Sequence, residues 1–206
     1  TDNCQDVSVS FSESREDGDC DANYTLTRTW SVADDCGNAS SHTQTVTIQD
    51  TTAPELTIAA DYTAECDEEH PMDSASATDN CGDVMIEEDM SVAYSCPHSY
   101  VITRVFTATD ECGNSTSATQ TITVEDTTAP AIEGAIEVMI ACEDYDAETS
   151  HSTASDNCGE VTLTWEDNQA SGGCVLPIGQ YVRLYTAVDE CGNESTFEQI
   201  LTLVDD

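Results

Sequence analysis

Basic residues are almost missing from this chain, which has no lysine and four arginines against 42 acidic residues, for a formal net charge of −38. A surface of that sign repels phosphates and anionic lipids, so we expect no nucleic-acid partner and no membrane insertion. The lack of lysine excludes Schiff-base chemistry. No apolar run approaches the ~20 residues that a membrane-spanning helix needs.

Motifs that carry catalysis are also missing. The sequence has no H-E-x-x-H pair, no G-x-S-x-G elbow and no glycine-rich phosphate loop, and its four histidines fall at unrelated positions. Pairs of carboxylates are expected by chance among so many acids. We therefore predict that the protein is not an enzyme.

Cysteine is abundant but never closely paired. The eleven cysteines include no C-x-x-C, whereas structural zinc sites usually have such close pairs. Disulfides in an oxidising compartment explain them better, which predicts an extracellular location.

Three short motifs recur at intervals of 76 to 79 residues. They divide the chain into the C-terminal part of a first repeat (1–50) and two complete repeats (51–126 and 127–206). Because repeat one lacks opening strands and a first cysteine, we expect the chain to be a window of a longer tandem array. The motifs are D-T-T-A-P at 50–54 and 126–130, D-N-C at 2–4, 79–81 and 156–158, and D-x-C-G-N at 34–38, 110–114 and 189–193.

Local patterns within a repeat indicate strands. Segments 100–108, 118–124 and 161–165 are rich in β-branched and aromatic residues, and turn formers separate such segments. No window has a capped helical period. The prediction is an all-β chain of tandem, disulfide-stapled immunoglobulin-like β-sandwich repeats of about 77 residues.

The ordered set T-D-N-C-G, C, an aromatic strand, D-x-C-G-N and D-T-T-A-P resembles the HYR-like (hyalin-repeat-like) modules. This resemblance implies a very long secreted surface protein, such as the gliding adhesins of Bacteroidota, and hence a bacterial cell surface or secreted filament. Hyalin repeats carry fewer cysteines and often read D-x-S-G-N, so the resemblance implies no disulfide pairing.

The geometry of a sandwich favours one pairing within each repeat. Loops 79–82 and 110–114 should lie at one end and Cys66 and Cys96 at the other, and a strand of about 20 Å separates them, beyond the ~7 Å Cα limit of a disulfide. Cys20 is then left alone. The predicted pairs are Cys4–Cys36, Cys66–Cys96, Cys81–Cys112, Cys142–Cys174 and Cys158–Cys191.

The recurring Asp and Asn residues are candidate ligands of structural Ca²⁺, which takes six to eight oxygens. A linker aspartate should enter each repeat beside two of its loops. The alternative is that these residues only form Asx-turns. The candidates are Asp2, Asn3, Asp34, Asn38, Asp50, Asp79, Asn80, Asp110, Asn114, Asp126, Asp156, Asn157, Asp189 and Asn193.

Three of the four arginines occupy one repeated position, six residues before the Asp of D-x-C-G-N and two before an aromatic residue. They are Arg28, Arg104 and Arg183. Residues i and i+2 of a strand share a face, so we expect internal salt bridges or stacking rather than ligand binding.

Thr51, Ser74 and Thr127 lie in segments that resemble the O-glycosylation motif of Bacteroidota, which is Asp, then Ser or Thr, then a small or apolar residue. A plain turn is the alternative for each of these positions.

Taken together, the patterns favour a structural stalk or filament of a cell-surface adhesin whose partners are its own neighbouring repeats. Two alternatives remain at this level. The modules could bind a surface polysaccharide or a partner cell, or the chain could be a fibre subunit that polymerises by strand donation.

Overall fold

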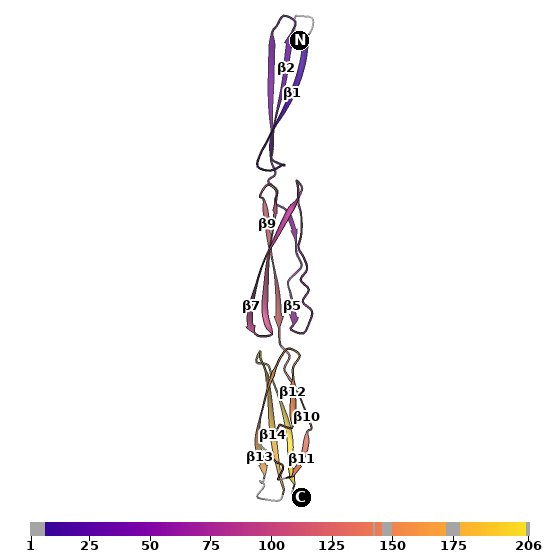
Figure 1. Ribbon diagram of the computed structural model, residues 1–206, viewed down its shortest axis with the longest axis vertical. Helices are drawn as coiled ribbons and strands as arrows, with labels where there is room; N and C mark the ends of the chain where they lie inside the picture. Colours follow the sequence, from indigo (N-terminus) through magenta and orange to yellow (C-terminus); the bar gives the residue numbers. More distant parts are fainter. Residues whose placement is uncertain (1–6, 142, 146–149, 172–177, 205–206) are drawn as a thin grey trace. The chain divides into compact units, whose positions relative to one another are not determined.

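The protein is built from strands alone in the part that the structure describes, and this confirms the predicted all-β sandwich class (Figure 1). The computed structural model describes residues 7–141, 143–145, 150–171 and 178–204. Within them, no helix has the length and apolar character to cross a membrane.

Repeat one contributes a single antiparallel sheet in the order β1-β2-β3. Its strands are β1 (Val7–Asp17), β2 (Tyr24–Asp34) and β3 (Ala39–Ile48). No second sheet belonging to repeat one is found among the described residues.

Repeat two contains a two-stranded and a four-stranded sheet, ordered β4-β6 and β5-β9-β8-β7. β5 runs parallel to β9, which places Ala64 opposite Val124. The strands are β4 (Glu55–Thr57), β5 (Tyr62–Glu65), β6 (Ser76–Thr78), β7 (Val84–Cys96), β8 (Ser99–Asp110) and β9 (Ser115–Glu125).

Repeat three has the same topology, with sheets β10-β12 and β11-β15-β14-β13, and β11 lies parallel to β15. A hydrogen bond of 3.0 Å from the His151 backbone N–H to the Tyr185 hydroxyl ties the two layers together. The strands are β10 (Ala131–Gly134), β11 (Glu137–Ala141), β12 (Ser152–Ser155), β13 (Val161–Ser171), β14 (Ile178–Asp189) and β15 (Glu194–Val204).

The chain divides into two compact units that do not coincide with the sequence repeats. Unit one comprises Thr1–Ala60, Asp73–Met90 and Arg104–Gln120, and unit two comprises Asp61–Met72, Ser91–Thr103 and Thr121–Asp206. Each unit therefore holds the linker between two repeats together with parts of both. The repeat boundaries stay a prediction, and the names repeat one, two and three refer to them.

Alternation along the strands explains which side chains form the thin cores. The second half of β8 is buried at every other residue, from Arg104 through Phe106 and Ala108 to Asp110, as period-2 geometry requires. In unit two, Ile140, Leu201 and Leu203 form a buried cluster, against which Val138, Tyr145 and Tyr181 pack.

Buried arginines hold these cores together, as predicted. The Arg183 side chain is 0% exposed and donates to both carboxylate oxygens of Asp167, at 2.5 and 2.8 Å. This bidentate pair holds the pKa of Asp167 below its usual value, because hydrogen bonds from Arg183 favour the charged carboxylate more than burial disfavours it.

Arg104 plays the same part in unit one. It donates to Glu88 at 2.7 Å and to Gln120 at 2.9 Å, and its guanidinium lies 4.7 Å from the centre of the Phe106 ring. Arg28, by contrast, is 38% exposed and pairs with an equally exposed Glu13.

Replacing Arg183 should therefore cost far more stability than replacing Arg28. We expect Arg183→Met to lower the free energy of unfolding by about 3–5 kcal/mol, because it removes the cation that neutralises the Asp167 carboxylate in a largely buried site. Arg28→Met should cost no more than about 1 kcal/mol, as for other exposed pairs. Calorimetric unfolding of both variants measures this, and equal losses would contradict the structural role of the buried arginine.

Candidate metal site and inter-repeat disulfides

The D-x-C-G-N motif forms the tight turn between β14 and β15, and its aspartate organises the turn. Asp189 Oδ1 accepts hydrogen bonds from the backbone N–H groups of Cys191, Gly192 and Asn193 at 2.6–2.9 Å, and Oδ2 accepts one from the Asn193 side chain at 2.7 Å. Gly192 has a φ of 92°, a conformation that favours glycine. The predicted Asx-turn is thus present at this motif.

The equivalent turns have the same geometry. Asp110 accepts from Cys112 and twice from Asn114, and Asp34 accepts twice from Asn38. Burial raises the pKa of Asp110 and of Asp189, but the hydrogen bonds outweigh it, so both pKa values lie below the usual one. These carboxylates are therefore held in the ionised form.

The D-N-C motif supplies a second aspartate, of which one carboxylate oxygen has no hydrogen-bond partner. In both complete repeats Oδ2 accepts the backbone N–H of the cysteine two residues on, at 2.8 Å for Asp79 with Cys81 and for Asp156 with Cys158. Oδ1 of Asp79 and of Asp156 is buried without a hydrogen-bond partner. A buried carboxylate oxygen of this kind is costly unless a cation or water meets it.

The linker aspartate between repeats two and three completes an acidic cluster. The backbone N–H of Asp126 donates to Ser99 Oγ at 2.8 Å, Asn193 donates to its carbonyl oxygen at 3.0 Å, and its Oδ2 is buried and unpartnered. Oxygens of Asp126, Asp156 and Asp189 lie within 4.8 Å of one another. We call these three residues the acidic site.

The acidic site is electrostatically unfavourable by itself. Burial, followed by the charges of Asp189, Asp156 and Glu65, raises the pKa of Asp126. Three carboxylates and two unpartnered oxygens at one point suit a hard cation that prefers oxygen ligands. The donor set therefore fits Ca²⁺.

The corresponding group in unit one is different. Asp50 and Asp79 lie there with the sulfur of Cys81 rather than with a third carboxylate, and Asp110 is not part of the cluster. Asn114 donates to the Asp50 carbonyl at 3.3 Å, which repeats the contact of Asn193.

The asparagines of the predicted ligand set serve other roles. Asn114 and Asn193 direct their NH₂ groups at carboxylates and at the linker carbonyl, so they lock turn to linker. The Asn80 amide donates to Cys81 Sγ at 2.9 Å. Asp34 and Asn38 bond within their own turn, and Asp2 and Asn3 lie outside the described residues.

The disulfides cross from one repeat to the next, and this overturns the predicted pairing. Cys66–Cys96, Cys81–Cys112 and Cys158–Cys191 are not formed, and Cys20 is not alone. The bonds are Cys20–Cys112, Cys66–Cys158 and Cys96–Cys191, with Cα–Cα distances of 5.1, 6.0 and 5.2 Å. The predicted Cys4–Cys36 and Cys142–Cys174 pairs each include a residue outside the described part.

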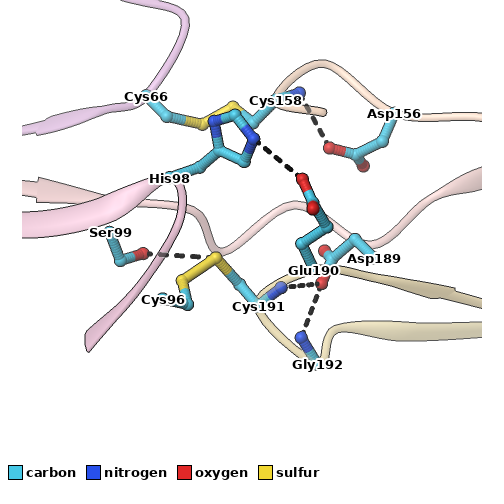
Figure 2. A network of polar contacts seen from close by, with 10 residues as sticks. All are labelled: Cys66, Cys96, His98, Ser99, Asp156, Cys158, Asp189, Glu190, Cys191 and Gly192. Atoms are coloured by element: carbon cyan, nitrogen blue, oxygen red, sulfur yellow. Dashed lines mark hydrogen bonds and ion pairs between the residues drawn. A yellow bond between two sulfur atoms is a disulfide. The ribbon is translucent and has the colours of Figure 1, made fainter. Parts of the chain in front are cut away.

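The predicted disulfide pairing is wrong for a physical reason. The prediction confined each cysteine to its own repeat, but in unit two Cys66 and Cys96 lie beside the loops of repeat three that carry Cys158 and Cys191 (Figure 2). Both bonds join sequence positions more than 90 residues apart, separated by 92 and 95 residues.

Polar contacts that the motifs do not reveal accompany these bonds. His98 Nε2 lies 3.1 Å from Glu190 Oε2, and Ser99 Oγ lies 3.8 Å from Cys191 Sγ, so the start of β8 and the residue before it meet the turn of repeat three beside the disulfide (Figure 2). His98 has no counterpart in the other repeats, so the repeated motifs do not reveal it.

The predicted glycan positions Thr51, Ser74 and Thr127 are exposed. The Thr127 hydroxyl donates to the Glu65 carboxylate, and its backbone N–H donates to the same group at 3.2 Å. This contact leaves the Thr127 oxygen engaged with a neighbour.

Comparisons with known proteins relate the chain to extracellular repeat proteins. It is 31% identical over 174 residues to the rat "Sushi, von Willebrand factor type A, EGF and pentraxin domain-containing protein 1", covering 78% of this chain and 5% of that protein. It is 28% identical over 188 residues to hyalin of Strongylocentrotus purpuratus, covering 84% of this chain and 15% of hyalin. No family model matches. These matches support a hyalin-repeat-like relationship, and the chain spans only a small part of the length of these relatives.

Among solved structures, the chain matches cadherin extracellular domains at TM-scores below 0.5. The protocadherin gammaB4 extracellular domain gives a TM-score of 0.42 at 14% identity, covering 96% of this chain and 43% of that one. Drosophila N-cadherin EC1-4 gives a TM-score of 0.34 at 14% identity, covering 98% of this chain and 67% of that one. Likeness at this level says nothing about the acidic site.

Cutting the linker tests the disulfide arrangement. If a protease site is inserted at Thr128 and cleaved, the two fragments should stay joined without reductant, because Cys66–Cys158 and Cys96–Cys191 span the cut. They should separate once reduced. Gel electrophoresis with and without dithiothreitol shows the result, and the Cys66→Ser/Cys96→Ser double variant is the control that should separate in both lanes. Separation of the parent chain without reductant would restore pairing within repeats.

Proposed function

We propose that this chain is part of the load-bearing stalk or filament of an extracellular adhesin. The observation that carries the proposal is that its disulfides join one repeat to the next. A module that only binds a ligand gains little from such bonds, whereas a stalk gains resistance to unravelling.

Under tension, the disulfides determine which residues bear the load. A pull on both ends follows the shortest covalent route, which runs through residues 1–20, crosses to 112, returns to 96, crosses to 191 and continues to 206. Only β8 and its flanks bear load in repeat two. The rest of that repeat is shielded from the force by the two bonds.

Under this proposal, neighbouring repeats are the partners of each repeat, and a polysaccharide or a second cell would be gripped elsewhere in the longer protein. The surface of a bacterium of the Bacteroidota is the setting that the motif resemblance implies. O-linked sugars at Thr51, and at Thr127 once its contact with Glu65 opens, would protect the linkers from proteases, and a sugar at Ser74 would cover the loop before β6.

Stretching single molecules tests whether the disulfides bear load in the proposed stalk. With disulfides intact, about a quarter of the chain lies on the covalent path, so the maximum extension should be roughly 180 Å, against roughly 700 Å after reduction, at about 3.5 Å per residue. Force spectroscopy with handles at both ends measures this, and Cys96→Ser is the matched variant that should lengthen the oxidised molecule. Full extension without reductant would contradict a load-bearing role.

The proposal assigns Ca²⁺ to the acidic site, with Asp126, Asp156 and Asp189 as ligands. Its support is the pair of buried, unpartnered oxygens, Asp126 Oδ2 and Asp156 Oδ1. A divalent ion would reverse the repulsion that raises the pKa of Asp126, and would fix the linker against the loops of repeat three. Binding to the folded form alone also adds stability by mass action.

Asp126→Asn should raise the melting temperature relative to the parent in chelator and lower it relative to the parent in Ca²⁺. The folded-state pKa of Asp126 is raised, so in chelator the ionised carboxylate destabilises the fold, and stability falls as pH rises from the ordinary aspartate value through the raised one. At pH 7 the metal-free variant should melt above the parent by about 2–4 °C, the shift for about 1 kcal/mol. At pH 3 the difference should vanish.

In about 1–10 mM Ca²⁺, a range suited to extracellular sites, the parent should gain stability and overtake the variant. Asp144→Asn, at an exposed position of unit two, is the control and should follow the parent in both buffers. Scanning calorimetry measures all three. A parent that melts identically in chelator and in Ca²⁺ would show that the acidic site holds no ion.

A further inference from the structure

Tyr94 of β7 lies on the inner face of its sheet, yet its side chain is 70% exposed. Its ring contacts that of Tyr100 on the neighbouring strand β8, with the ring centroids 5.4 Å apart. Tyr100 belongs to the alternating set of β8 residues that includes the buried Arg104 and Phe106, so both tyrosines lie on the inner face. Val92, two residues before Tyr94 on β7, is 39% exposed. This margin of the inner face is therefore open, apolar and aromatic.

The segment after β5 covers only part of this face. The His70 ring lies edge-on to Tyr100, with centroids 6.4 Å apart, and the Tyr62 hydroxyl donates to the Pro71 carbonyl at 3.2 Å. Tyr62 and Tyr100 are half-buried, whereas Tyr94 stays exposed. The covered rings thus support Tyr94 from one side and leave its other side to solvent.

The hairpin that carries the two tyrosines is anchored at its tip. Ser95 Oγ donates to the Ser99 carbonyl at 3.1 Å, and Cys96 is bonded to Cys191 of repeat three (Figure 2). Both contacts lie within two residues of a tyrosine of the pair. A ligand that meets the pair therefore has little of the protein to order, which favours binding.

Repeat one shows what a ring at this position contacts in the same fold. Tyr24 lies 76 residues before Tyr100, and the guanidinium of Arg15 on β1 stacks over its ring, 4.0 Å from the centroid. β1 lies beside β2 as β7 lies beside β8, but β7 has no basic residue. The tyrosine pair of repeat two thus receives no cation from the strand that supplies one in repeat one.

The charge around the pair favours a cation from outside. Segments 61–72 and 91–103, which build this part of unit two, contain no lysine or arginine. Asp67, Glu68 and Glu69 are exposed and lie directly before His70. These carboxylates repel an anionic ligand, whereas a cation is attracted both by them and by the negative faces of the rings.

We propose that Val92, Tyr94, Tyr100 and the acidic run 67–69 form a docking surface, the tyrosine surface, for a basic segment of another protein. An arginine of that segment stacks its guanidinium on the exposed face of Tyr94, as in the contact of repeat one, and its methylene stem packs on Val92. The proposal depends neither on the stalk nor on the acidic site.

A second copy of this chain is a poor partner for the tyrosine surface. Two copies with a net charge of −38 each repel one another. All four arginines of the chain are already paired with carboxylates. The arginine that stacks on Tyr94 therefore belongs to a different, basic protein.

A short fluorescent peptide of alternating arginine and glycine is the probe, and the same peptide with citrulline for arginine is its neutral counterpart. Fluorescence anisotropy at about 0.15 M salt measures the affinity. We expect Tyr94→Ala to weaken binding of the arginine peptide about three- to tenfold, as for loss of a partly exposed cation–π contact. Tyr94→Phe keeps the ring and should bind within about twofold of the parent. The citrulline peptide should bind more weakly and respond little to Tyr94→Ala.

Two matched controls separate the tyrosine surface from general attraction to an acidic chain. Met139→Ala should leave binding unchanged, because Met139 is also in unit two and is 73% exposed. Asp67→Asn/Glu69→Gln should weaken binding more than Glu143→Gln/Asp144→Asn, which also removes two exposed charges from unit two. Melting curves of all variants check that they are folded.

Equal binding of the arginine and citrulline peptides, or equal effects of Tyr94→Ala and Met139→Ala, would overturn the proposal. A neutral glucan oligosaccharide that binds the parent and is lost in Tyr94→Ala, while the arginine peptide is unaffected, would assign the surface to sugars instead. No variant alters a disulfide, so these outcomes are separate from the test of the stalk.

Discussion

Covalent bonds between neighbouring repeats are the constraint on which the rest of this structure depends. The repeats are small and their cores are thin, with a buried apolar cluster of three residues in unit two. Domains of this size bury a modest share of their surface and are marginal without staples. Bonds that close loops of more than 90 residues restrict the unfolded chain strongly, by about 4–5 kcal/mol each in the chain-entropy model. They also tie the stability of one repeat to the presence of the next.

The acidic side chains at the linker between repeats two and three fall into two groups. One carboxylate folds the D-x-C-G-N turn by accepting backbone N–H groups, and the turn's asparagine then holds the linker carbonyl. The linker aspartate and the D-N-C aspartate keep one buried oxygen each without a partner. Turn formation does not exclude cation binding, because the turn uses the oxygens of Asp189 and leaves Asp126 Oδ2 and Asp156 Oδ1 without a partner.

In the described part of the chain, repeat one contributes one sheet and no second layer. Its arginine, glutamine and strand residues match those of repeats two and three in sequence, yet they are exposed where their counterparts are buried. Burial in these sandwiches comes from the second layer, so the same residues behave as core or as surface according to whether that layer is present.

The sequence by itself determined the β class, the repeat, the turn motifs and the structural role of the arginines, because alternation, turn chemistry and spacing are local properties. It also pointed to Asp126, Asp156 and Asp189 as one group. It failed on the cysteines: spacing tells which end of a sandwich a residue occupies, and Cys66 and Cys96 do share an end. Which neighbour a cysteine meets at that end depends on contacts between segments more than 90 residues apart. Only the tertiary structure brings those segments together, since no local pattern encodes their distance.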